Sequence, residues 1–122
     1  MTIAFWCVLI AALLPYLFTG IAKAGAEGFD NRRTRDFQAS LSGWRARAHA
    51  AHLNGFEALP LFASAVIIAH LTGKPQAHVD ALAACFIVLR LVYGALYIAD
   101  QATLRSLVWL AATLCPVAMF FL

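Results

Sequence analysis

The chain has 122 residues, of which 63% are hydrophobic and 12% are charged, and its formal net charge is +3. A soluble domain averages about 45–50% apolar and about 25% charged residues, so a soluble chain of this length could not bury so much apolar surface. We therefore expect a protein whose solvent is the lipid bilayer, and we expect no nucleic-acid partner because no soluble scaffold surrounds the basic residues.

The first apolar run predicts a transmembrane helix over residues 2–22. No charged residue occurs before Lys23, and about 20 apolar residues span the hydrocarbon core. A cleaved signal peptide is the competing interpretation, but it would need a basic segment first and a shorter apolar run. Pro15 should bend the helix, which membrane helices tolerate.

Residues 23–43 form the one long polar segment, which we predict to be a loop with one short helical turn. Basic residues gather in it and just after it: Lys23, Arg32, Arg33, Arg35, Arg45 and Arg47. Such a cluster between two spans indicates the cytoplasmic side of a membrane. We therefore expect this loop in the cytoplasm and the protein in an inner membrane.

The second helix is predicted over residues 44–72, with a polar first half and a kink at Pro60. Arg47, Asn54 and Glu57 are seven and three residues apart, so they share a face of this helix. Two histidines also lie in the polar half, three residues apart. Because no further ligand set accompanies them, we expect no metal.

The third and fourth helices are predicted over residues 77–99 and 104–122. Arg90, Tyr93 and Tyr97 fall on one face of the third helix. A charge within a span is expensive and indicates function and a nearby partner. Because Arg90 and Glu57 lie at a similar depth, about 15 Å from the cytoplasmic ends of their helices, we expect them to neutralise one another.

The predicted fold class is therefore all-α: residues 1–122 form a single four-span membrane domain, an up-down-up-down four-helix bundle. Short loops make neighbouring helices antiparallel, so the cytoplasmic loop at residues 23–43 places both termini outside, on the other side of the membrane. Cys7, Cys85 and Cys115 each lie in an apolar run, so we interpret them as small buried hydrophobic residues and expect no disulfide. Small residues such as Gly94 and Ala95 permit close helix packing.

The polar side chains of separate spans converge at the cytoplasmic level. Arg105 and Ser106, which open the fourth helix, lie at the same level as the polar half of the second helix. Each residue alone also has a structural interpretation: Arg47 as a snorkelling side chain, Tyr97 as an interfacial tyrosine, Arg105 as a membrane anchor. Together they predict a basic, phenol-lined pocket that accepts a small anionic ligand from water beside an apolar partner from lipid.

Two motifs resemble a known family, the membrane-associated proteins in eicosanoid and glutathione metabolism. The first is RAHAAHLNGFEALPLF, residues 47–62, and the second is RLVYGALY, residues 90–97, with the Arg-Ser pair that opens the fourth helix. The second motif is the more specific. Length and the four-span layout are also similar, so the resemblance covers essentially the whole chain and suggests a bacterial type of microsomal glutathione transferase.

The resemblance implies a homotrimer that holds glutathione between neighbouring subunits, near the cytoplasmic side. It implies that Asn54 and Glu57 of the second helix contact glutathione and that residues of the third helix line the same site: Arg90, Tyr93 and Tyr97. Arg105 would stabilise the glutathione thiolate, with Ser106 as a further catalytic participant and Arg47 as a further binding residue. A nearby guanidinium lowers a thiol pKa, so the thiolate would attack lipophilic electrophiles or hydroperoxides in the bilayer, as in detoxification.

Two alternatives stay open at this point. Ala50 stands where glutathione-binding members usually carry an arginine, which favours a non-catalytic lipid-binding protein of the same fold. Glu57, as an acid within a span, fits a small proton-coupled drug transporter, although the other buried charges would then be unexplained.

Overall fold

The computed structural model describes residues 1–122 and contains helices only. They are α1 (Ile3–Lys23), the 3-10 helix η1 (Asn31–Arg33), α2 (Thr34–Ala39), α3 (Gly43–Leu71), α4 (Gln76–Ile98) and α5 (Ala102–Met119). Four of them, α1, α3, α4 and α5, are long and apolar enough to cross a membrane. The predicted fold class, an all-α four-helix membrane bundle, is confirmed. The last helix ends at Met119 instead of continuing to residue 122.

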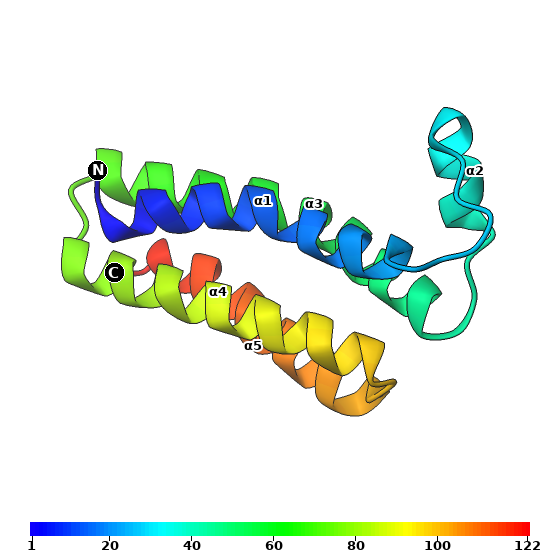
Figure 1. Ribbon diagram of the computed structural model, residues 1–122. Helices are drawn as coiled ribbons and strands as arrows, with labels where there is room; N and C mark the ends of the chain where they lie inside the picture. The colour runs from blue at the N-terminus through cyan, green and yellow to red at the C-terminus, as the bar shows by residue number, and fades with distance from the viewer.

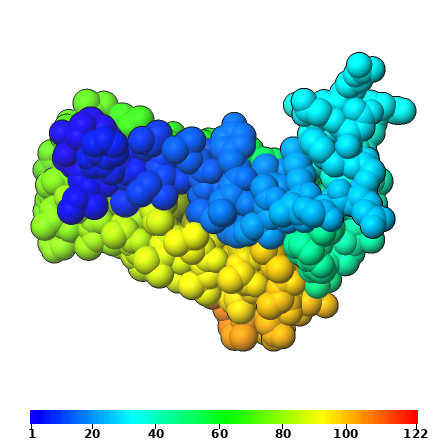
Figure 2. Space-filling view, in the orientation of Figure 1, coloured from blue at the N-terminus to red at the C-terminus, as the bar shows by residue number.

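The four long helices run antiparallel in chain order (Figure 1). Both termini lie at one end of the bundle, which we call the termini end. The polar segment with α2 and the turn between α4 and α5 lie at the other, which we call the α2 end. Helix α1 packs mainly on α3, and α4 packs mainly on α5, while α3 and α4 join the two pairs. Figure 2 shows α2 projecting from the side of the bundle.

Charged side chains from other helices hold both ends of α1. Asp80 of α4 accepts a hydrogen bond from the backbone N–H of Ala4 at 2.8 Å. Arg45 of α3 donates to the carbonyl oxygens of Ala22 and Ala24 at 2.9 and 2.7 Å. The first N–H groups and last C=O groups of a helix have no partner within it, and the helix dipole favours an anion at the first end and a cation at the second. These contacts therefore fix α1 along the bundle axis.

Two glycines let α1 approach its neighbours closely. A Cβ atom on Gly55 of α3 would lie 2.7 Å from Cγ of Pro15, and a Cβ atom on Gly94 of α4 would overlap the ring of Phe18. The close packing expected at Gly94 is therefore made within one chain, between α1 and α4. Small residues at helix contacts are the usual means of close packing in membranes.

The two halves of the bundle are packed differently. The half near the termini end holds the larger core, in which the rings of Phe62 and Phe86 stack at 4.0 Å. The half near the α2 end holds only a small buried cluster of Phe18, Ala51 and Tyr93. Polar groups of the spans gather in this second half, where the apolar core is smallest.

The prediction that all three cysteines are buried is wrong for one of them. Cys7 and Cys115 are buried, but Cys85 is exposed on the bundle surface. Its position on α4 turns outward, and a thiol is apolar enough for a surface that faces lipid.

We expect Gly94→Ala to lower the free energy of unfolding by about 1–3 kcal/mol, because the added methyl group overpacks the contact with Phe18. Unfolding in mixed detergent micelles would measure this change. Gly20→Ala is the matched control, since a Cβ atom there meets no atom within 4 Å. An equal effect of the two substitutions would contradict the close contact of α1 with α4.

Candidate functional site

A row of two tyrosine rings with an arginine at each end connects α4 to the start of α5. The guanidinium of Arg90 lies 4.3 Å from the ring centroid of Tyr93, and that of Arg105 lies 4.2 Å from the ring centroid of Tyr97. The two tyrosine rings meet edge to face at 5.7 Å. We call these four residues the arginine–tyrosine row. Three of them share a face of α4 because they are spaced by three and four residues, as the sequence predicts.

The expected ion pair between Arg90 and Glu57 is absent. Arg90 is only 4% exposed, yet its side chain forms no ion pair, since the one ion pair of the chain joins Arg33 to Asp36. Arg90 lies against the Tyr93 ring inside the bundle, whereas Glu57 lies exposed on α3. Matched depth did not bring the two side chains together, because they point in different directions.

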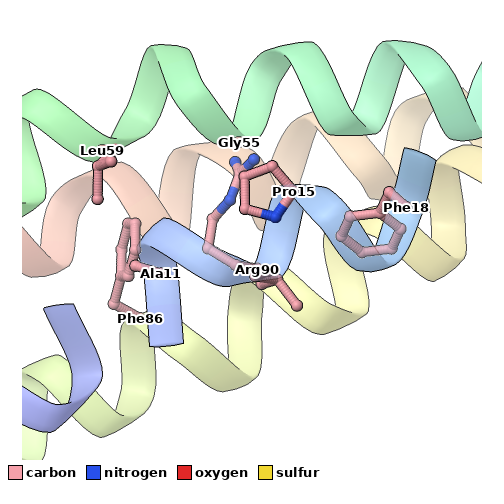
Figure 3. A pocket seen from close by; sticks show the side chains of 8 residues that line it. Ala11, Pro15, Phe18, Gly55, Leu59, Phe86 and Arg90 are labelled. Carbon is pink, nitrogen blue, oxygen red and sulfur yellow. The ribbon is translucent and has the colours of Figure 1, made fainter. Parts of the chain in front are cut away.

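Arg90 reaches into a small cavity between three helices (Figure 3). Its guanidinium points towards α3 near Gly55, and the opposite wall comes from α1. The cavity measures about 10 Å³, which is room for about one water molecule. It is lined by Ala11, Leu14, Pro15, Phe18, Gly55, Leu59, Phe86 and Arg90. This buried cation is therefore surrounded by aliphatic groups and by the aromatic rings of Phe18, Phe86 and Tyr93.

Asn54 and Glu57 form a second polar group, on α3. The Asn54 side-chain amide donates a hydrogen bond to the Glu57 carboxylate at 2.9 Å, while Asn54 Oδ1 is buried without a partner. Both residues line a groove of about 180 Å³ between α3 and α5. Its lining is Asn54, Glu57, Ala58, Leu61, Phe86, Trp109, Thr113 and Pro116. No hydrogen bond or ion pair joins this group to the arginine–tyrosine row within one chain.

Arg47 does not share the surroundings of Asn54 and Glu57. Its Nε donates to the carbonyl oxygen of Ile98, the last residue of α4, at 3.1 Å. A cation at a helix C-terminus satisfies a free carbonyl and opposes the negative end of the dipole. The structure therefore gives Arg47 a role in joining α3 to the end of α4.

Arg105 and Ser106 face in different directions. Arg105 turns inward onto Tyr97, whereas Ser106 is exposed and its hydroxyl donates to the carbonyl oxygen of Ala102 at 3.0 Å. Consecutive residues of a helix point about 100° apart. Ser106 therefore lines a shallow apolar hollow on the outer side of α5, with Leu107 and Trp109.

Sequence reasoning missed several residues that position the site. Arg45 and Asp80 hold the ends of α1, and Trp109 and Thr113 complete the groove beside Asn54. Asp80 had a usable signal, because it lies four residues after Gln76, which donates to it at 2.9 Å. The contacts of Arg45, Trp109 and Thr113 depend on how α3 and α5 are rotated about their axes, and no local sequence pattern specifies that rotation.

The arrangement has a simple chemical consequence. Neither guanidinium of the arginine–tyrosine row is paired with an acid of the chain, and guanidinium groups bind carboxylates and other anions through paired hydrogen bonds. The tyrosine rings between them meet edge to face and supply two hydroxyl groups. Arg105 and Tyr97 are only partly buried, so an anion can approach the row at this end, whereas Arg90 and Tyr93 are enclosed at the other end.

We expect Tyr97→Leu to lower the free energy of unfolding by about 0.5–2 kcal/mol, because it removes the ring beneath the Arg105 guanidinium. Tyr97→Phe keeps the ring and should retain most of that energy. Unfolding of both variants in the same micelles would compare them. A larger loss in Tyr97→Phe than in Tyr97→Leu would show that the hydroxyl group matters and the stacking does not.

Comparison with known families identifies the family of the chain. The sequence model of the MAPEG family, the membrane-associated proteins in eicosanoid and glutathione metabolism, matches residues 3–122. Searches of curated proteins and of solved structures found no match. The matched residues include the whole arginine–tyrosine row and the Asn54–Glu57 pair. With its four apolar spans, the chain is a multi-pass integral membrane protein that belongs to the MAPEG family.

Proposed function

We propose that this protein is a membrane glutathione transferase or peroxidase that acts on lipophilic substrates. One observation carries the proposal: the arginine–tyrosine row holds two guanidinium groups that have no acidic partner in the chain. Glutathione supplies two carboxylates and an ionisable thiol. Membership of a family named for glutathione and eicosanoid metabolism makes this tripeptide the ligand that we favour.

In this proposal Arg105 stabilises the thiolate of bound glutathione, since a nearby guanidinium lowers a thiol pKa. Buried Arg90 adds positive potential from within the bundle, which favours an anion at the Arg105 end of the row, and Tyr97, backed by Tyr93, borders the place where the tripeptide lies. The thiolate sulfur forms a C–S bond to an electrophilic carbon, and the leaving group departs with the bonding electrons. With a hydroperoxide, the sulfur takes the terminal oxygen and an alcohol leaves, after which a second glutathione gives the disulfide and water.

A homotrimer would complete this site. The Asn54–Glu57 pair opens towards the outside of the bundle, so a ligand held there would lie beside the partly buried Arg105 end of the row in a neighbouring copy. Asn54 Oδ1, which has no partner in one chain, would then accept from the tripeptide. Ser106 and the apolar outer side of α5 would receive the lipophilic substrate from the bilayer.

We propose that the site faces the cytoplasm of a cell whose inner membrane holds the protein. Residues 23–47 at the α2 end contain six basic and three acidic residues and so carry the whole net charge of +3. Basic segments between spans stay in the cytoplasm. Both termini would then lie outside.

A specific observation favours a second candidate function, a non-catalytic lipid-binding protein. Ala50 offers no cation one turn before Asn54, and Arg47, one turn earlier, is bonded to the carbonyl oxygen of Ile98. Carboxylate recognition from α3 would then be weak. In that case the groove beside Asn54 would hold a lipid chain.

We expect Arg105→Met to lower the rate of glutathione conjugation to 1-chloro-2,4-dinitrobenzene by about 10- to 100-fold, because it removes the charge that stabilises the thiolate. The pH of half-maximal rate should rise, since the thiol then ionises at higher pH. Arg105→Lys keeps the charge and should recover part of the rate. Assays of the purified protein in detergent would measure both.

Thermal stabilisation by ligand gives the control for this test. S-methylglutathione has no ionisable thiol, so Arg105→Met should weaken stabilisation by glutathione and leave that by S-methylglutathione unchanged. A wild-type protein that shows no conjugation above background and no stabilisation by glutathione would overturn the proposal.

The lipid-binding alternative predicts that wild-type protein retains lipid after purification and shows no thermal stabilisation by glutathione. Ala50→Arg should then gain thermal stabilisation by glutathione. Mass spectrometry of retained lipid, with thermal shift for both proteins, would measure this. Strong stabilisation of the wild type by glutathione, unchanged in Ala50→Arg, would contradict the alternative.

A further inference from the structure

The segment from Phe29 to Ala39, which we call the arm, lies outside the arginine–tyrosine row and the groove. It includes η1 and α2. In Figure 1 the arm stands crosswise to the four long helices and extends past the side formed by α1 and α3. The space-filling view shows the same projection (Figure 2). Because the long helices cross the membrane, an element crosswise to them at the α2 end lies along the membrane surface.

The arm is attached to the bundle at its base. Gln38 donates a side-chain hydrogen bond to Thr19 of α1 at 2.7 Å, and α2 contacts α3. These contacts hold the arm beside the end of α1. The arm therefore has a defined position and does not depend on membrane contact for its direction.

The level of the arm corresponds to the lipid headgroups. Trp44, five residues after the arm, is 42% exposed at the start of α3, and exposed tryptophans at helix ends mark the membrane–water interface. Helix α3 has 29 residues, a length of about 44 Å, so it is longer than the hydrocarbon core of about 30 Å. Its first turns therefore extend into the headgroup region, where the arm ends.

The chemistry of the arm matches an anionic lipid surface. Arg32 and Arg35 are exposed and form no ion pair, whereas Arg33 is paired with Asp36 at 3.1 Å. Phe29 is 43% exposed and meets Phe37 edge to face at 5.3 Å. Free cations beside exposed aromatic rings are the combination found in segments that lie in the interface of anionic membranes.

We propose that the arm binds the phosphate groups of anionic phospholipids in the leaflet beside α1 and α3, through Arg32 and Arg35. Phe29 rests among the headgroups and limits how far the arm lifts from the surface. Arg33 contributes less because Asp36 occupies it. The arm thereby selects the lipids next to one side of the bundle, independently of any ligand of the arginine–tyrosine row.

Native mass spectrometry of the full chain, released from neutral detergent with equal amounts of chain-matched phosphatidylglycerol and phosphatidylcholine, tests this proposal. Wild-type protein should retain phosphatidylglycerol in excess. The double substitution Arg32→Gln/Arg35→Gln should lower the ratio of bound phosphatidylglycerol to phosphatidylcholine, by up to about fivefold for each arginine removed. Asp36→Asn should raise the ratio, because it frees Arg33.

Lys74→Gln is the control for a general loss of charge, since Lys74 lies at the termini end and its ammonium bonds the carbonyl oxygen of Leu122; it should leave the ratio unchanged. An equal ratio in wild type and double variant, or a fall with Asp36→Asn, would overturn the proposal. So would a change of oligomeric mass in the double variant, which would mean that the arm contacts a second copy. Glutathione conjugation by the double variant should equal that of wild type, so the two proposals fail separately.

Discussion

The position of α1 depends on two charged side chains that other helices contribute. Asp80 accepts from the first turn of α1, and Arg45 donates to its last carbonyl oxygens. The first N–H and last C=O groups of a helix have no partner within it, and these two side chains supply partners from inside the protein. With both ends held, α1 has one register against α3 and α4, and Pro15 and Phe18 fall opposite the two glycines that admit them. Pro15 and Phe18 also line the cavity that contains the Arg90 guanidinium.

The basic residues at the α2 end have three different tasks. Arg45 and Arg47 donate to carbonyl groups at the ends of α1 and α4. Arg90 and Arg105 stack on tyrosine rings. The stacking offsets part of the free-energy cost of placing a charge within a span, and it leaves the N–H donors of each guanidinium available to an anion. The arginines of the arm remain exposed at the surface. The stacked pair combines burial with guanidinium groups that form no hydrogen bond or ion pair within the chain, and it lies on two adjoining helices of the bundle, which is why we assign ligand binding to it.

Two polar groups of the site lie apart within one chain. The arginine–tyrosine row faces into the bundle, and the Asn54–Glu57 pair faces a groove on its outside. In the homotrimer that we propose, a ligand held by the Asn54–Glu57 pair of one copy would lie beside the less buried Arg105 end of the row of the next. Helix packing in membranes gains little from apolar contact alone, so a shared polar ligand would also strengthen the association of the copies.

Residue patterns by themselves determined the four spans, their antiparallel order and the shared face of Arg90, Tyr93 and Tyr97. These features follow from apolar length, loop length and helical period, which are properties of neighbouring residues. Only the tertiary structure decided that Arg90 stacks on Tyr93 instead of pairing with Glu57, that Arg47 bonds Ile98, and that Asp80 reaches Ala4 across 76 positions. The physical reason is that periodicity fixes a residue's face on its own helix, whereas the partner across an interface depends on how each helix is rotated and shifted, and contacts such as Gly94 against Phe18 set that rotation.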